Sequence, residues 1–149
     1  MKRGVFAAIL ICLLLAVISG QAMAAYEFYM HIGGIAGEST HSGHESWIEV
    51  LNFGSKSLPT RTTRTGSAGA GDFSIKHKAN TKISPAILNL LLTNATFDMK
   101  FDVVQDTKIL HHEFHGCCVT GYSINRSGSA PPIEEITFHY SSRSWSWGM

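Results

Sequence analysis

The stretch that decides the fold class runs from Phe97 to Val103 and reads FDMKFDV. Apolar and charged side chains alternate at every position, which puts all the apolar ones on one face of an extended strand. Tyr26–Ile32 and Phe73–Lys78 alternate in the same way, with Tyr29 on the polar side of the first of them. These period-two patterns predict a mainly β protein whose sheets bury one face and expose the other.

The last predicted strand changes its pattern along its length. Ile136, Phe138 and Tyr140 share one parity, whereas Trp145 and Trp147 share the other. A continuous strand cannot bury both sets on one face, so we expect a bulge or bend in the segment 141–144. A bend of this kind suits a closed barrel or the corner of a sandwich.

One stretch favours a helix. Ser84 is a good N-cap residue, Pro85 suits the first helical position, and an apolar run follows as far as Asn94. We therefore expect about two turns of helix that begin at Ser84 and end near Asn94.

Two segments lack any period. The segment Gly54–Gly71 is polar, rich in Gly, Ser and Thr, and carries Arg61 and Arg64. A loop of this length in a small domain is either disordered or functional, commonly as a reaching arm or a binding loop. Ser127–Pro132 is a shorter break between two late strands.

The segment Trp47–Phe53 is apolar on both parities. A strand with no polar face is either central beneath a covering helix or buried against another subunit, and its period cannot decide between them. We therefore take Trp47, Ile48, Val50 and Leu51 as candidate subunit-contact residues, together with the arm residues Arg61 and Arg64.

The first 24 residues have the three parts of a cleavable secretory signal peptide. Lys2 and Arg3 form a basic start, Val5–Ile18 is an apolar run too short to span a bilayer stably, and Ala22-Met23-Ala24 is a small-x-small cleavage site. We expect cleavage between Ala24 and Ala25, no retained membrane anchor, and a secreted or periplasmic protein. The alternatives are an uncleaved anchor or initiation at Met23.

Removing 24 residues from 149 leaves 125, enough for a single domain, residues 25–149, with one core. The leader holds two of the twelve basic residues and none of the eleven acidic ones, so the mature net charge is −1. That balance gives no reason to expect a nucleic-acid partner.

Few residues suggest chemistry. His111, Glu113 and His115 would share a strand face that could in principle hold zinc or copper, but we favour a solvated polar face and expect no metal and no cofactor. His41 and His44 lie in a Gly/Ser-rich turn and are expected to be exposed. No nucleophile elbow or phosphate loop occurs, so we predict a protein that is not an enzyme.

The leader contains Cys12, so the mature chain keeps two adjacent cysteines, Cys117 and Cys118. Neighbours on a strand point to opposite faces, so two separate thiols are the simpler interpretation. A vicinal or cross-subunit disulfide stays open. Either cysteine could be drawn as a dyad with a histidine, but in a chain with eight histidines such a pairing carries little information.

An ordered set of motifs resembles one family, Hcp, the haemolysin-coregulated tube protein of type VI secretion systems. The motifs are Tyr29–Ser39 with its Gly-Ile-x-Gly-Glu-Ser turn, Trp47–Leu51, Phe73–Lys78, Ile83–Leu88, Val119–Ser123, Glu134–Tyr140 and Trp145–Trp147. The resemblance therefore covers essentially the whole mature chain. It implies a β-barrel of two antiparallel sheets with one flanking α-helix, assembled into hexameric rings that stack into a tube.

In the family, an extended loop reaches a neighbouring subunit or ring, and the resemblance gives that role to Gly54–Gly71. The predicted leader departs from the family, whose subunits ordinarily carry no export signal. We therefore expect a non-enzymatic, ring-forming secreted protein, either a tube subunit or an exported paralogue, with other type VI components or effector cargo as further partners. The alternative is a secreted β-barrel that acts as a binding or adhesion module without forming tubes.

Overall fold

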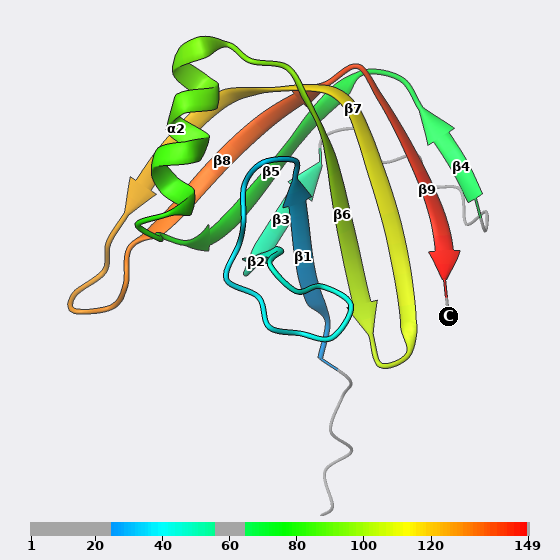
Figure 1. Ribbon diagram of the computed structural model, residues 1–149, viewed down its shortest axis with the longest axis horizontal. Helices are drawn as coiled ribbons and strands as arrows, with labels where there is room; N and C mark the ends of the chain where they lie inside the picture. Colours follow the sequence, from blue (N-terminus) through cyan, green and yellow to red (C-terminus); the bar gives the residue numbers. More distant parts are fainter. Residues whose placement is uncertain (1–24, 56–64, 149) are drawn as a thin grey trace, which may run out of the picture.

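The computed structural model describes residues 25–55 and 65–148, which form nine strands and a helix (Figure 1). The elements are β1 (Glu27–Ile32), β2 (Ile48–Val50), β3 (Asn52–Ser55), β4 (Thr65–Ala68), β5 (Gly71–Lys78), α2 (Ile83–Thr93), β6 (Phe97–Gln105), β7 (Lys108–Asn125), β8 (Ile133–Tyr140) and β9 (Ser142–Gly148). The prediction of a mainly β chain with a single flanking helix is confirmed for these residues.

The strands form two antiparallel sheets that share β7. The first half of β7 pairs with β6 and β9, and its second half pairs with β8. The first sheet has the order β2-β1-β6-β7-β9-β4, and the second has the order β3-β5-β8-β7. The crossing point lies at Gly116, whose φ of 59° favours glycine and lets the strand turn from one layer into the other.

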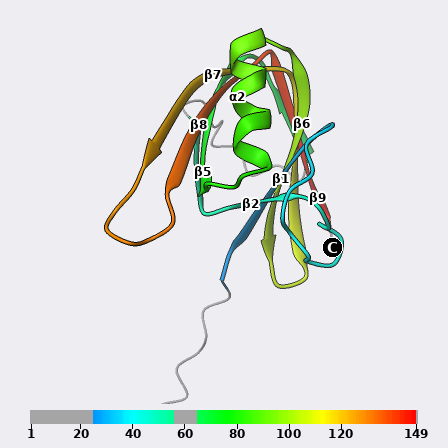
Figure 2. The same cartoon turned by 60° about the vertical axis from the view of Figure 1, so that its left-hand side comes forward.

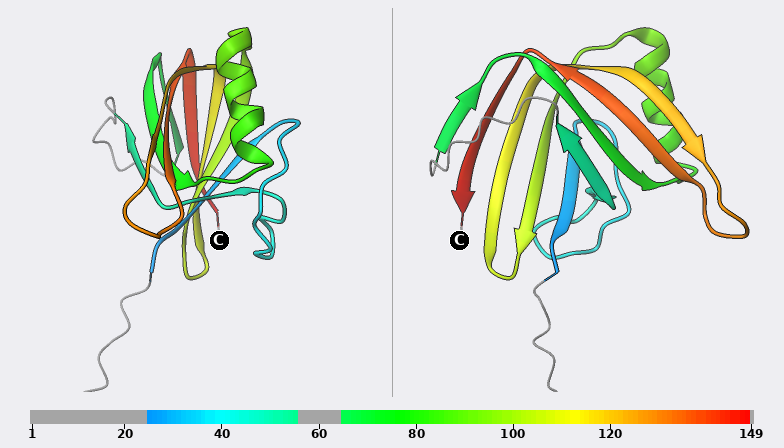
Figure 3. Two further views of the ribbon diagram at one scale, coloured as in Figure 1. Left: turned by 90° about the vertical axis from the view of Figure 1, so that its left-hand side faces the viewer. Right: turned by 180° about the vertical axis from the view of Figure 1, so that it is seen from behind.

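Three other connections also pass from one sheet to the other. β2 and β3 are separated by Leu51 alone, β8 and β9 by Ser141 alone, and β4 and β5 by residues 69–70. The path β2-β1-β6-β7-β8-β5-β3 therefore starts and ends on one chain segment, which closes it into a barrel. Figure 3 shows the two layers edge-on and from behind.

The Leu51 corner explains why the sequence is apolar on both parities there. Ile48 and Val50 point into the core, with 0% and 6% of their surface exposed. After the corner the parity changes, and Phe53 packs against Phe28 and Phe101 with ring centroids 5.0 and 4.9 Å apart. A corner between two sheets therefore accounts for the pattern without a covering helix.

The bend expected in the last strand is present at Ser141, between β8 and β9. The prediction of one unstructured loop over Gly54–Gly71 is wrong at both ends. Thr65–Ala68 form β4 against β9, and Gly54 belongs to β3. Gly and Ser residues have low strand propensity, so the sequence hid a strand that the neighbouring β9 stabilises by pairing. Arg61 and Arg64 lie outside the described residues.

Both sheets contribute apolar side chains to one core, which α2 closes at the side where β7 changes layer (Figure 2). The buried members are Met30, Ile32, Ile48, Val50, Phe73, Ile75, Ile83, Ile87, Met99, Phe101, Phe114, Cys117, Val119, Ile136, Phe138 and Tyr140. The inward side chains of FDMKFDV, Met99 and Phe101, are fully buried among them, as the alternation predicts.

The helix ends as expected at Asn94, which has left-handed φ and ψ, but its start was predicted wrongly. Ser84 is not the N-cap, because α2 begins at Ile83 after Lys82. The Asn80 side chain accepts a hydrogen bond from the Lys82 amide, and Ser84 Oγ accepts one from the Asn80 amide. This exchange moves the first turn upstream and leaves Pro85, which has no N–H, within it.

The predicted leader, residues 1–24, lies outside the described residues. Among residues 25–55 and 65–148, no helix has the length and apolar character that crossing a bilayer requires.

Candidate functional site

Residues 33–47, which connect β1 to β2, fold back over the outer face of the first sheet (Figure 1). Three backbone hydrogen bonds hold the connection together: Gly37 N–H to Ser46 O, Ser46 N–H to Ser39 O, and Ser39 N–H to Trp47 O. A side chain at Gly37 would collide with the Trp47 carbonyl, so only glycine fits there. We call residues 33–47 the cover loop.

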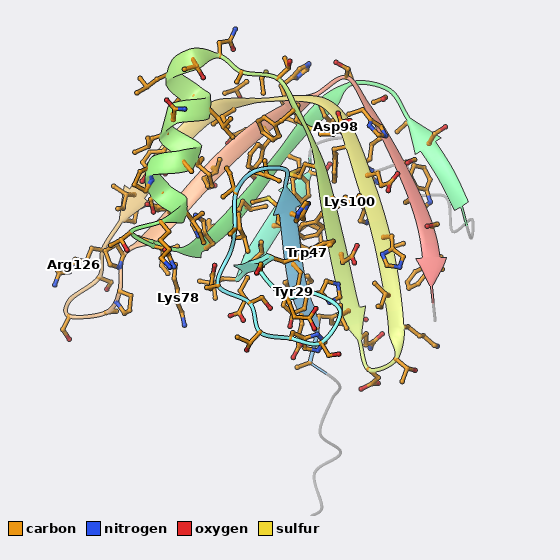
Figure 4. The ribbon with its side chains drawn as sticks, viewed as in Figure 1. Tyr29, Trp47, Lys78, Asp98, Lys100 and Arg126 are labelled. Atoms are coloured by element: carbon orange, nitrogen blue, oxygen red, sulfur yellow. The ribbon has the colours of Figure 1, made fainter. Side chains whose placement is uncertain are left out.

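His44 anchors the cover loop to the sheet. Its Nε2 lies 2.8 Å from Asp102 Oδ2, and its ring stacks on Tyr29 with centroids 4.5 Å apart. Trp47 meets the same ring edge to face at 4.9 Å, and Figure 4 shows Tyr29 and Trp47 beside the loop. The expectation that His44 is exposed is therefore wrong, since only 3% of its surface is accessible, whereas His41 keeps 42% of its side chain exposed.

Asp102 joins three segments of the chain. Besides His44 of the cover loop, it accepts a hydrogen bond from His111 Nδ1 of β7 at 2.9 Å, while only 4% of its own surface is exposed. An ionised carboxylate only accepts hydrogen bonds, so both imidazoles donate to it. The alternation places Asp102 on the outer face correctly, but the sequence does not reveal that the loop covers this face. The same loop buries Tyr29, and burial raises the pKa of that phenol, as does its hydrogen bond to Glu27.

The outer face of β7 carries His111, Glu113 and His115, as predicted. Each faces a partner of β6: Asp102, Lys100 at 3.6 Å and Asp98 at 3.2 Å, respectively. The Gly116 N–H and then His115 lower the pKa of Asp98. The imidazoles are thus engaged with strand partners, and among the described residues no three His, Cys, Asp or Glu side chains are grouped to hold a metal.

A groove of about 650 Å³ crosses this face. The cover loop forms one wall, β6 and β7 the floor, and β9 and β4 the far wall. The lining comprises Gly43, Trp47, Gly66, Lys100, Asp102, His111, His112, Glu113, Ser144, Trp145 and Ser146. The floor offers charged groups and the far wall hydroxyls, so the groove suits a polar partner.

The candidate contact strand presents little of itself to a partner. Ile48 and Val50 are core residues, and Trp47, the last residue of the cover loop, is half-buried. Leu51, at the corner, has 48% of its surface exposed. Of these four residues, Leu51 therefore offers the most exposed surface.

Two buried basic groups, His112 and Arg143, have unusual proton affinities. Burial, and secondarily the Arg143 guanidinium, lowers the pKa of His112 to about 4. Arg143 is itself only 4% exposed and lies over the rings of Phe114 and Trp145, at 5.6 and 5.3 Å from their centroids. Cation–π contact replaces part of the hydration that this cation loses.

A second polar group lies in the core below α2. His77 Nε2 is 3.0 Å from Glu134 Oε2, but the two are not aligned for a hydrogen bond, and both side chains are almost fully buried. Tyr122 donates to Glu134 Oε1 at 2.6 Å. Burial lowers the pKa of His77. His77 and Glu134 are 57 positions apart in the chain, so the sequence carried no signal for their pairing.

Comparison with known proteins gives a family and a fold. The sequence model of the family described as "Type VI secretion system effector, Hcp" matches residues 29–147. None of the curated proteins is similar enough to count as a match.

Three solved structures illustrate the likeness in fold. Hcp1 from Salmonella typhimurium is 19% identical with a TM-score of 0.64, and the match covers 80% of this chain and 84% of that one. A type VI secretion system effector from Yersinia pestis is 24% identical with a TM-score of 0.61, covering 76% and 83%. The sheath–tube complex of an extracellular contractile injection system matches at 9% identity and a TM-score of 0.53, covering 90% and 96%.

Proposed function

Because the chain belongs to the Hcp family of type VI secretion effectors, we propose that it is a structural, ring-forming protein that acts outside the cytoplasm. The observation that carries the proposal is the extent of the family match, which spans the barrel from β1 to β9. This proposed role is non-enzymatic and requires no catalytic residue in the barrel. Its role is to present surfaces to copies of itself, in a ring of six.

The first sheet offers edges for such contacts. β2 pairs only with β1, and β4 pairs only with β9, so each keeps one side free of strand pairing among the described residues. Unpaired strand edges are ready templates for another chain. The exposed Leu51 lies next to β2 and adds an apolar contact at that edge.

The proposal includes export by the predicted leader, with cleavage between Ala24 and Ala25, and gives Arg61 and Arg64 a place in a contact arm. The alternative, a secreted binding module, draws support from the groove of about 650 Å³, which falls in the size range of ligand sites. Ring formation distinguishes the two, because a binding module needs no self-assembly.

The experiment starts from the full chain, expressed with its own leader and purified from the periplasm and medium. Light scattering and native mass spectrometry should give a particle of six subunits, and N-terminal sequencing should begin at Ala25. A clean monomer at high concentration refutes the ring, and a start at Met23 or Met1 refutes export by cleavage.

A pair of matched leucine variants tests the contact strand. Leu51→Asp should break the particle into smaller species, because a buried carboxylate in an interface is costly. Leu92→Asp changes the same residue type on the exposed face of α2, where 83% of the side chain is accessible, and should leave assembly unchanged. Equal assembly of both variants would remove Leu51 from the interface.

A further inference from the structure

A row of three side chains on the outer face of the second sheet brings together a nucleophile, a base and a carboxylate. Cys118 of β7 lies directly opposite His139 of β8, and His139 lies directly opposite Asp72 of β5. Opposite residues of an antiparallel pair share a face, with Cβ atoms about 4.5–5.5 Å apart. All three side chains point outward, since their neighbours Cys117, Phe138 and Phe73 are core residues.

The carboxylate decides which nitrogen of the histidine is the base. His139 Nδ1 lies 3.0 Å from Asp72 Oδ1. An ionised carboxylate only accepts hydrogen bonds, so Nδ1 carries the hydrogen and the neutral ring keeps its lone pair on Nε2. β8 lies between β5 and β7, so Asp72 and Cys118 are on opposite sides of His139. With Nδ1 directed at Asp72, the Nε2 lone pair is on the far side of the ring from Asp72. A nucleophile, a base and a group that orients the base form the arrangement that activates cysteine thiols.

The two adjacent cysteines are therefore unlike. Cys117 is fully buried, and burial raises the pKa of its thiol to about 12, which makes it inert. Cys118 is partly exposed and free. Of these two cysteines, Cys118 alone combines access from solvent with a neighbouring histidine.

We propose that Cys118 is an activated thiol that exchanges with disulfides of other molecules and so becomes the site of a mixed disulfide. The Sγ–H proton passes to His139 Nε2, and the thiolate attacks one sulfur of the incoming disulfide. A Cys118–sulfur bond forms, the incoming sulfur–sulfur bond breaks, and the thiolate that leaves takes the proton from His139. No net oxidant is needed, because the incoming disulfide is reduced as Cys118 is oxidised.

The open sheet face suits this reaction better than acyl transfer. Disulfide exchange needs only a thiolate and an approach to it, whereas acyl transfer also needs donors for an oxyanion. Two nearby groups that could act on the thiol are each held by an ion-pair partner. Lys76 of β5 is 3.5 Å from Glu135 of β8, and His115 is 3.2 Å from Asp98 of β6 near the bend of β7.

The ordinary chemistry of thiols limits the size of the effect. A free thiol of pKa about 8.5 is roughly 3% ionised at pH 7, so complete activation can raise its rate by at most about 30-fold. Nucleophilicity falls as a thiol becomes more acidic, which reduces the gain. We therefore expect removal of the base to slow exchange about tenfold at pH 7.

The test uses the full chain purified from the periplasm, reduced and desalted, and independent of whether it forms rings. Its reaction with dithiobis(nitrobenzoate) is followed by absorbance, and with glutathione disulfide by mass spectrometry. A fast phase should be present in the parent protein and absent from Cys118→Ala. His139→Gln and Asp72→Asn should slow it, with the larger effect from His139→Gln. His115→Gln removes a similar surface histidine from a His–Asp pair and should leave the rate unchanged.

The pH dependence separates activation from a structural effect. Below pH 8, the rate of His139→Gln should fall about tenfold per pH unit, because only the rare thiolate reacts. The parent rate should fall less steeply over the same interval, because His139 takes up the thiol proton. Identical profiles of parent and His139→Gln, with both folded by circular dichroism, would overturn the proposal. A fast phase that survives in Cys118→Ala would also overturn it.

Discussion

The low proton affinity of His112 makes a quantitative prediction about stability in acid. Burial is the main reason why its pKa lies at about 4 in the folded protein, and only 8% of its surface is exposed. In the unfolded chain, an ordinary histidine has a pKa of about 6.5. Below that value the unfolded state binds a proton that the folded state refuses, so the free energy of unfolding falls as the pH falls from 6.5 to 4.

The magnitude follows from the difference of about 2.5 pKa units, each worth about 1.36 kcal/mol. The complete effect is therefore about 3 kcal/mol, and between pH 7 and pH 5 it amounts to about 2 kcal/mol. His77 shifts in the same direction, so the wild-type curve contains both contributions. The variant His112→Gln removes one of them and keeps a polar side chain of similar size.

The assay is urea unfolding followed by tryptophan fluorescence at one protein concentration, at pH 7 and pH 5. The wild-type protein should lose about 2 kcal/mol more than His112→Gln over this interval. The variant can be less stable at both pH values, since only the pH dependence is diagnostic. His41→Gln, which changes an exposed histidine, serves as the control. Equal pH dependence in wild type and His112→Gln would show that His112 is protonated within the folded protein, against the buried environment described above.

Three further predictions concern the cover loop and the core. His44→Ala leaves Asp102 without one of its donors and should cost about 1.5–3 kcal/mol in urea unfolding, with faster proteolysis of the cover loop. Phe101→Ala, at a fully buried ring, should cost about 3–5 kcal/mol in the same assay, and a loss below 1 kcal/mol would contradict its central place. Gly37→Ala should lower the melting temperature because its Cβ collides with the backbone, whereas Gly69→Ala, where the space is open, should not.

The elements that could be predicted are those whose signal is local. FDMKFDV alternates because its strand lies on the core, and β6 has Met99 and Phe101 inside as expected. The apolar residues change parity between Tyr140 and Trp145, and this change predicted the corner at Ser141. The helix start was missed because the exchange between Asn80 and Ser84 competes with the simpler cap at Ser84.

The contacts of the candidate surfaces had no local signal. His44 and Asp102 are 58 positions apart, and His139 and Asp72 are 67 apart. A histidine in a Gly/Ser-rich turn gives no indication that it will be buried beneath its own loop. The eight histidines offered many possible partners to Cys118, and only the strand register singles out His139.

By itself, the sequence determined the strands that alternate clearly and the presence of the helix, because the alternation of apolar residues is a property of consecutive positions. It also carried the family resemblance, since ordered motifs need no coordinates. Only the tertiary structure decided which charged side chain meets which, because sheet register and loop placement bring distant residues within hydrogen-bond reach. For that reason, Asp102 proved to be the anchor of the cover loop, and Cys118 was found beside a histidine that Asp72 orients.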